Sequence, residues 1–97
     1  MLEVDRVKVE GDEFLGLKAE LPDAPPLLLL VGSKGFIMCG YLNLDVAERL
    51  NTAAAFVTGV RTFDDMLNAE VKGVTSRAMS LGVESGKVLK TVIGRLA

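Results

Sequence analysis

Three features of the sequence predict a mixed α+β domain. Near the N-terminus, apolar and charged residues alternate on both sides of Gly11, as in a β-hairpin. The run LLLLV at 27–31 lacks alternation, which is typical of a central strand buried on both faces. From residue 36 onward, short apolar runs alternate with segments that carry helix caps and helical spacing. We therefore expect an N-terminal hairpin, a compact mixed sheet with short crossover helices, and a C-terminal amphipathic helix.

The turn of this hairpin is expected at Gly11 and Asp12, because a Gly-X pair fits a two-residue connection. Its first arm, LEVDRVKVE, changes the parity of its apolar residues between Val4 and Val7. This change indicates either a bulge near residues 5–6 or apolar groups on both faces of the strand. Two apolar faces suit a strand covered on one side by its own domain and on the other by a neighbouring subunit.

The proline-rich segment PDAPP at 22–26 is expected to act as a hinge. It would divide a single domain, 1–97, into a hairpin at 1–21 and an αβ body at 27–97. No internal repeat or long linker divides the chain further.

The first part of the body should turn through GSKG at 32–35 into a strand, FIMCGYL, that is antiparallel to the central strand and contains Cys39. Asn43 is expected to cap a helix that runs to Asn51. A fifth strand, AAAFVTGV, would follow a connection long enough for a parallel crossover. The apolar face of this helix is predicted to consist of Val46, Ala47 and Leu50.

The later elements are marked by capping residues. Thr62 is expected to cap the helix FDDMLNA, and a short strand, VKGVT, should follow it as a further crossover. Ser76 should cap a helix that Gly82 ends, and Ser85 should cap the last helix. The apolar face of that last helix is predicted to comprise Val88, Leu89, Val92, Ile93 and Leu96.

The composition predicts self-association. The 97 residues are 49% hydrophobic with a mean hydropathy of +0.36, which is more apolar surface than a small domain readily hides. We therefore expect a homo-oligomer. A net charge of −2 with scattered basic residues argues against nucleic acid as a partner, and no run approaches the ~20 apolar residues of a membrane helix. The N-terminus lacks the apolar core of a signal peptide and the lone cysteine suits a reducing compartment, so we expect a cytoplasmic protein.

The chain contains no histidine, and this absence limits its chemistry. Histidine is the usual general base, the usual partner of a nucleophilic Ser or Cys, and the commonest metal ligand. Triads and zinc sites are therefore not expected, nor is any cofactor. Carboxylates, lysines, one thiol, one tyrosine and backbone amides remain available for catalysis.

Three sequence segments resemble the YunC-like family of bacterial and archaeal proteins, a domain of unknown function. These segments are GFIMCGYLN, GVRTFDDMLNAEV and VTSRAMSLGVESG, and the resemblance spans nearly the whole chain. It implies tetramerisation through an N-terminal β-sheet region, which would correspond to residues 1–21. It brings no established activity, cofactor or catalytic residue.

Two groups of candidate site residues follow from local patterns. Cys39 stands four residues before the Asn43 cap, where a helix start could activate a thiol, although free cysteines are more often buried packing residues. The neighbouring Gly40 could mark close approach to a ligand. In GSKG, Lys34 and Gly35 could hold an anion through backbone amides and a positive charge, although a plain turn is the more frequent structure.

Other charged residues have weaker functional interpretations. Asp64 and Asp65 could bind a divalent cation, but adjacent carboxylates in a first helical turn more often favour the helix dipole. Arg61 and Arg77 each stand near a helix start and could steer an anionic ligand. The segment GVESGK at 82–87 lacks the spacing and the leading strand of a phosphate-binding loop.

Two functional hypotheses remain. The first is a non-catalytic oligomeric module that binds a small metabolite or a protein partner. The second is a small thiol-dependent enzyme that uses Cys39, with a carboxylate or lysine as base.

Overall fold

A computed structural model describes residues 2–97 of the chain, so Met1, the first residue of the expected hairpin, lies outside the described residues. One six-stranded sheet, in the order β1-β2-β3-β4-β5-β6, carries several short helices, which confirms the α+β class. The strands are β1 Leu2–Val9, β2 Asp12–Leu21, β3 Ala24–Val31, β4 Phe36–Met38, β5 Ala54–Phe56 and β6 Gly73–Val74. The helices are α1 Leu44–Arg49, α2 Phe63–Asn68, α3 Ser76–Ser80, α4 Leu89–Val92 and the 3₁₀ helix η1 Ile93–Leu96.

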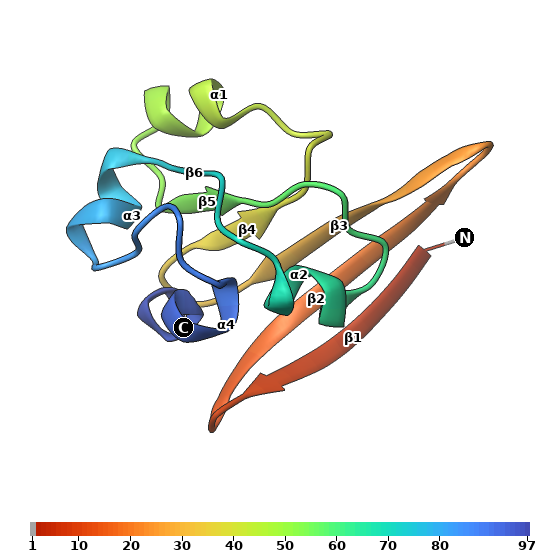
Figure 1. Cartoon of the computed structure of the whole chain (residues 1–97), viewed down its shortest axis with the longest axis horizontal. Coiled ribbons are helices and arrows are strands. Elements are labelled where there is room, and N and C mark those ends of the chain that lie inside the picture. The colour runs from red at the N-terminus through yellow and green to blue at the C-terminus, as the bar shows by residue number, and fades with distance from the viewer. Residues whose placement is uncertain (1) are drawn as a thin grey trace.

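The first three strands form a long ribbon that projects beyond the helices at both of its turns (Figure 1). The β1–β2 turn is made by Glu10 and Gly11, one residue earlier than expected, with φ angles of 48° and 89°. Positive φ at both central residues matches the twist of the flanking strands. Val9 therefore pairs with Asp12, which belongs to β2 rather than to the turn.

The β1 strand has no bulge at residues 5–6, because its pairing with β2 is unbroken from Leu2 to Val9. The alternative expectation, apolar residues on both faces, is confirmed. Val7 lies opposite Phe14 and packs against the main core, whereas Val4 lies opposite Leu17 on the other face.

Residues 22–26, expected as a hinge, instead form a tight turn and the first residues of β3. Asp23 takes a φ of 53° in this turn, a conformation that aspartate tolerates well. The register between β2 and β3 shifts between Ala19 and Leu21, opposite the two prolines that lack an N–H to donate. The hairpin therefore continues into the same sheet as the rest of the chain, and its Phe14 is only 1% exposed in the shared core.

Short strands complete the sheet. β4 is antiparallel to β3, as expected, but it ends at Met38, so Cys39 follows the strand rather than lying in it. β5 is parallel to β4, which confirms the first crossover. β6 is antiparallel to β5, so the second expected crossover is wrong. The connection between β5 and β6 reaches across the sheet, where the ring of Phe63 in α2 covers Gly16 of β2. The chain then returns to the sheet at the carboxyl end of β5, so β6 runs in the opposite direction to β5.

The two faces of the sheet are covered differently. The main core lies on one face, between the sheet and helices α2, α3, α4 and η1, and includes Phe14, Leu28, Leu30, Ile37, Ala55, Met66, Leu89, Ile93 and Leu96. A smaller cluster lies on the other face, where α1 covers Met38 and Ala54. Only Ala47 of the predicted α1 face is buried, whereas Val46 and Leu50 are exposed. Partly buried side chains complete this smaller cluster, and they include Leu29 of β3 as well as Phe36, Leu44 and Phe56.

The helix caps follow the sequence in part. The side chains of Asn43 and Thr62 accept from the backbone N–H groups of residues 45 and 65, as expected. Thr75, rather than Ser76, caps α3, and Gly82 follows that helix with a φ of 101°. α4 begins after Val88 without a side-chain cap, so the Ser85 prediction is wrong. No helix of residues 2–97 is long and apolar enough to cross a membrane.

Candidate functional site

A cleft of about 460 Å³ opens at the carboxyl ends of the parallel strands β4 and β5. The chain leaves β4 into one loop and β5 into another, and both loops line the cleft together with the start of β3. We call this feature the β4–β5 cleft. Its walls are formed by Pro25, Pro26, Cys39, Gly40, Tyr41, Gly59, Val60 and Arg61.

Cys39 contributes to the cleft wall from a buried position, with 3% exposure, and packs in the same core cluster as Ile37. β3 pairs with β4 only from Leu29 onward, so the backbone amide of Leu28 has no partner strand on this side. The Cys39 Sγ atom accepts a hydrogen bond from that amide at 3.4 Å. The thiol therefore provides the hydrogen-bond acceptor that a partner strand would otherwise offer to Leu28. Its buried environment favours this structural role.

Tyr41 joins the β4 loop to the start of β3. Its hydroxyl donates a hydrogen bond to the Pro25 carbonyl oxygen at 2.7 Å. No local sequence pattern marks this residue as part of a site, although it is the only tyrosine in the chain and stands two positions after Cys39. Its contact with Pro25 joins residues 16 positions apart, so only the folded chain reveals it.

Among the described residues that line the cleft, Arg61 is the one that carries a charge. It is exposed, and its guanidinium forms no ion pair or hydrogen bond with any residue from 2 to 97. The nearby carboxylate of Asp65 accepts from the Arg61 backbone N–H at 3.1 Å, while the Asp65 amide donates to Thr62. Asp65 therefore stabilises the start of α2, as the helix-dipole interpretation of the Asp64–Asp65 pair predicts.

Three residues of the cleft lining have backbone N–H groups that are free to donate. Within the described part of the chain, the N–H groups of Gly40, Gly59 and Val60 have no acceptor. A Cβ at Gly40 would find only a Thr58 methyl at 3.7 Å, so this glycine borders open space. Gly59 has a φ of 71°, a backbone conformation that glycine adopts more easily than other residues. The cleft thus combines apolar walls with unpaired donors and one positive charge.

Lys34 and Gly35 lie at the opposite end of β4, away from Cys39 and Gly40. A Cβ at Gly35 would stand 2.4 Å from the Ala53 carbonyl oxygen, so this glycine permits close packing of the backbone. The Lys34 amide donates to the Leu96 carbonyl at 3.1 Å and is not available to an anion. The lysine shares a separate surface hollow of about 480 Å³ with Arg77. The predicted site residues therefore belong to two separate places.

Glu48 links two helices that flank the sheet. Its carboxylate accepts hydrogen bonds from the Ser76 hydroxyl and, at 2.8 Å, from the Ser76 backbone N–H at the start of α3. These two bonds favour the ionised carboxylate and lower the pKa of Glu48 below its usual value of 4.5. Elsewhere in residues 2–97, no three side chains of Cys, Asp or Glu come together as possible metal ligands.

A second surface feature lies on β1, β2 and β3, on the sheet face that α1 leaves uncovered. Opposed residues share a face, so Val4, Leu17 and Leu29 form one row across the three strands. We call the apolar surface formed by Val4 and Leu17 of this row, with Leu2 and Leu15, the open sheet face, since Leu29 at the inner end of the row packs against the smaller cluster under α1. Leu2, Val4 and Leu15 are exposed by 66%, 60% and 43%, respectively.

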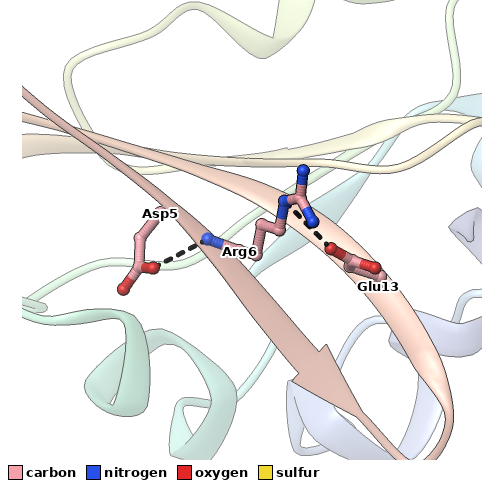
Figure 2. A network of polar contacts seen from close by, with 3 residues as sticks. All are labelled: Asp5, Arg6 and Glu13. Carbon is pink, nitrogen blue, oxygen red and sulfur yellow. Dashed lines mark hydrogen bonds and ion pairs between the residues drawn. The ribbon is translucent and has the colours of Figure 1, made fainter.

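Charged residues bound the open sheet face near the β1–β2 turn. Arg6 Nε lies 3.4 Å from Glu13 Oε1, and the Arg6 backbone N–H donates to Asp5 (Figure 2). Both partners of the ion pair are solvated, so it contributes little to stability. It marks the end of the apolar surface.

These features define a small α+β protein with a mixed six-stranded sheet and a cleft at the ends of its parallel strands. A family model described as DUF1805, a domain of unknown function, matches residues 38–96. The chain is also 31% identical over 90 residues to the uncharacterized protein YunC of Bacillus subtilis (strain 168), covering 89% of this chain and 88% of that protein. The chain belongs to the YunC-like family, DUF1805, as the resemblance of its sequence segments implied.

A solved structure has the same fold. The crystal structure of TA1206, a protein of unknown function from Thermoplasma acidophilum, matches with a TM-score of 0.93 and 38% sequence identity. The match covers 100% of this chain and 94% of that one. The family model begins at Met38, so it includes both loops of the β4–β5 cleft, whereas β1, β2 and β3 precede it.

Proposed function

We propose that this protein is a homo-oligomeric, non-catalytic module that binds a small molecule in the β4–β5 cleft. The observation that carries this proposal is the combination of apolar walls and unpaired donors in a cleft of about 460 Å³. Clefts of a few hundred Å³ with apolar walls and a few convergent polar groups are typical ligand sites. The lone free thiol is consistent with a cytoplasmic location.

A non-catalytic role is supported by the chemistry of the lining. Its residues include no carboxylate, lysine or histidine that could act as a general base. The Cys39 thiol already accepts the Leu28 amide and is almost fully buried. The lining therefore has the groups needed to bind a ligand, whereas catalysis would need a general base that it does not contain.

The alternative, a thiol-dependent enzyme, is favoured by one observation. Cys39 stands in the cleft wall beside Gly40, whose free amide could stabilise negative charge on a bound acyl group. A thiol reagent distinguishes the two functions. Fast modification of the native protein near neutral pH would support the enzyme, whereas modification only on unfolding supports the binding module.

The homo-oligomer is proposed to form through residues 1–21 as a tetramer. The open sheet face supports this assembly, because β1 and β2 contribute exposed leucine and valine side chains that a second copy could cover. β1 is also an edge strand, so its outer backbone groups are free to pair across subunits. The resemblance to the family implies the same region.

Fragment screening by ¹H–¹⁵N NMR tests the proposed ligand site. A mixed library of small polar and apolar fragments is titrated against the full chain, and amide shifts are mapped on the sequence. Shifts that cluster at residues 39–41 and 58–61 are expected. Clustering at the Lys34–Arg77 hollow, or no clustering, would contradict the proposal.

A further inference from the structure

We propose that the ligand of the β4–β5 cleft is a small monocarboxylate with an apolar body, an inference that rests on the proposed binding function. The carboxylate would lie against Arg61 and the free backbone amides, and the apolar body against Pro25 and Pro26. Three properties of the cleft lead to this ligand class: its charge, its unpaired donors and its walls.

The charge of the cleft has one sign. The whole chain has a net charge of −2, yet the lining carries a single formal charge, which is the positive charge of Arg61. The carboxylate of the nearby Asp65 accepts from the Arg61 backbone amide, and neither Asp64 nor Asp65 forms an ion pair with the Arg61 guanidinium. The planar guanidinium presents paired donors that match a carboxylate. The cleft therefore favours an anion over a neutral or cationic ligand.

The unpaired amides have the same preference. Gly40 belongs to the loop after β4, and Gly59 and Val60 belong to the loop after β5, so both loops that line the cleft contribute an amide without an acceptor among residues 2–97. Val60 is only 6% exposed, and a backbone N–H without an acceptor in such a place costs free energy unless water or a ligand accepts its hydrogen bond. An acceptor-only group such as a carboxylate meets this requirement.

The walls limit the number of charges on the ligand. Pro25, Pro26, the Tyr41 ring and Val60 offer apolar surface to the remainder of the molecule. A second carboxylate or a phosphate ester would bring further negative charge to a cleft with one cation, and burying that charge without a partner is unfavourable. A single carboxylate on an apolar body fits both parts of the cleft.

The test uses matched pairs of acids and their primary amides: acetate and acetamide, hexanoate and hexanamide, phenylacetate and phenylacetamide. Each compound is titrated against the ¹⁵N-labelled full chain near neutral pH. We expect amide shifts at Gly40, Gly59 and Val60 with each acid, and tighter binding of hexanoate and phenylacetate than of acetate. Each acid should bind at least roughly tenfold more tightly than its amide, since one charge-assisted hydrogen bond accounts for such a factor.

Two variants locate the charge effect. Arg61→Gln should weaken hexanoate binding roughly tenfold and leave hexanamide binding unchanged. Arg77→Gln removes an arginine from the other hollow and should change neither. Equal binding of acids and amides, or an Arg61→Gln variant that keeps its preference for acids, would overturn the carboxylate inference while the ligand cleft stands. If no acid or amide shifts the cleft amides, the carboxylate inference is contradicted, and the mixed fragment library then decides whether the proposed ligand site fails with it.

Discussion

The two halves of the sheet differ in strand length and in cover. β1, β2 and β3 are eight to ten residues long and are covered by helices on one face only, whereas β4, β5 and β6 have two or three residues each and lie between α1 and the other helices. The long strands are held together by many backbone hydrogen bonds, so they remain paired even where no helix covers them. Their uncovered surface, the open sheet face, is nevertheless apolar. Short strands end early, and their loops are free to form a cleft. The molecule thus separates the surface proposed for assembly from the site proposed for ligand binding.

The strongest test of this comparison asks whether the long strands belong to the same core as the rest. Phe14 lies on β2, is 1% exposed and packs in the main cluster with residues from α4 and η1. Phe14→Ala should lower the free energy of unfolding by about 3–5 kcal/mol, measured by urea denaturation. Leu2→Ala, at an exposed position of β1, is the control and should cost well under about 1 kcal/mol. A small effect at Phe14 would mean that the long strands are an independent appendage.

The open sheet face can be tested without removing any core residue. Val4→Lys places a charge in its apolar row and should convert the proposed tetramer into a smaller species, because a buried lysine would have no partner there. Light scattering coupled to gel filtration measures the mass. Glu3→Lys introduces the same side chain at the adjacent position, on the opposite face of β1, and should leave the mass unchanged. A monomeric wild-type protein at micromolar concentration, or an intact tetramer in Val4→Lys, would refute assembly through this face.

Cys39 tests the cleft half of the molecule. Cys39→Ala leaves the Leu28 amide without its acceptor and opens a small cavity, so we expect a loss of about 1–2 kcal/mol in the free energy of unfolding. Denaturation with urea checks the value, and the fold should be retained. Binding of a small ligand should survive the substitution if the thiol is structural. A reproducible activity that Cys39→Ser abolishes, with folding and assembly unchanged, would establish the enzyme instead.

The smallest expected effect concerns pH. Because its folded-state pKa is lowered, Glu48 contributes stability above its usual pKa of 4.5, and this contribution is lost as the pH falls through the lower, folded-state value. Melting temperatures measured from about pH 6 down to about pH 3 should therefore fall slightly less in Glu48→Gln than in the wild type. Glu84→Gln is the control, since Glu84 forms no hydrogen bond or ion pair with residues 2–97. Identical pH profiles for wild type and Glu48→Gln would mean that the Ser76 contact is absent in solution.

Local features of the fold could be predicted from the sequence. The hairpin, the antiparallel pairing of LLLLV with FIM, and the caps at Asn43 and Thr62 are all present. Each depends on residues close together in the chain, so alternation, turn residues and capping side chains carry the information. Cys39 and Gly40 could likewise be predicted to lie in one site, because they are adjacent in the chain.

Long-range relations were decided only by the tertiary structure. Whether α1 buries Ala47 or Leu50 depends on which strands lie beneath it, and the direction of β6 depends on where α2 packs. Likewise, the contact of Tyr41 with Pro25 and the place of Arg61 in the same cleft join residues that are far apart in the chain, beside the part of β3 that extends past the end of β4. The sequence by itself determined the local conformations, since short-range hydrogen bonds and sterics set them, whereas the packing of distant apolar surfaces selected the faces, the strand direction and the cleft.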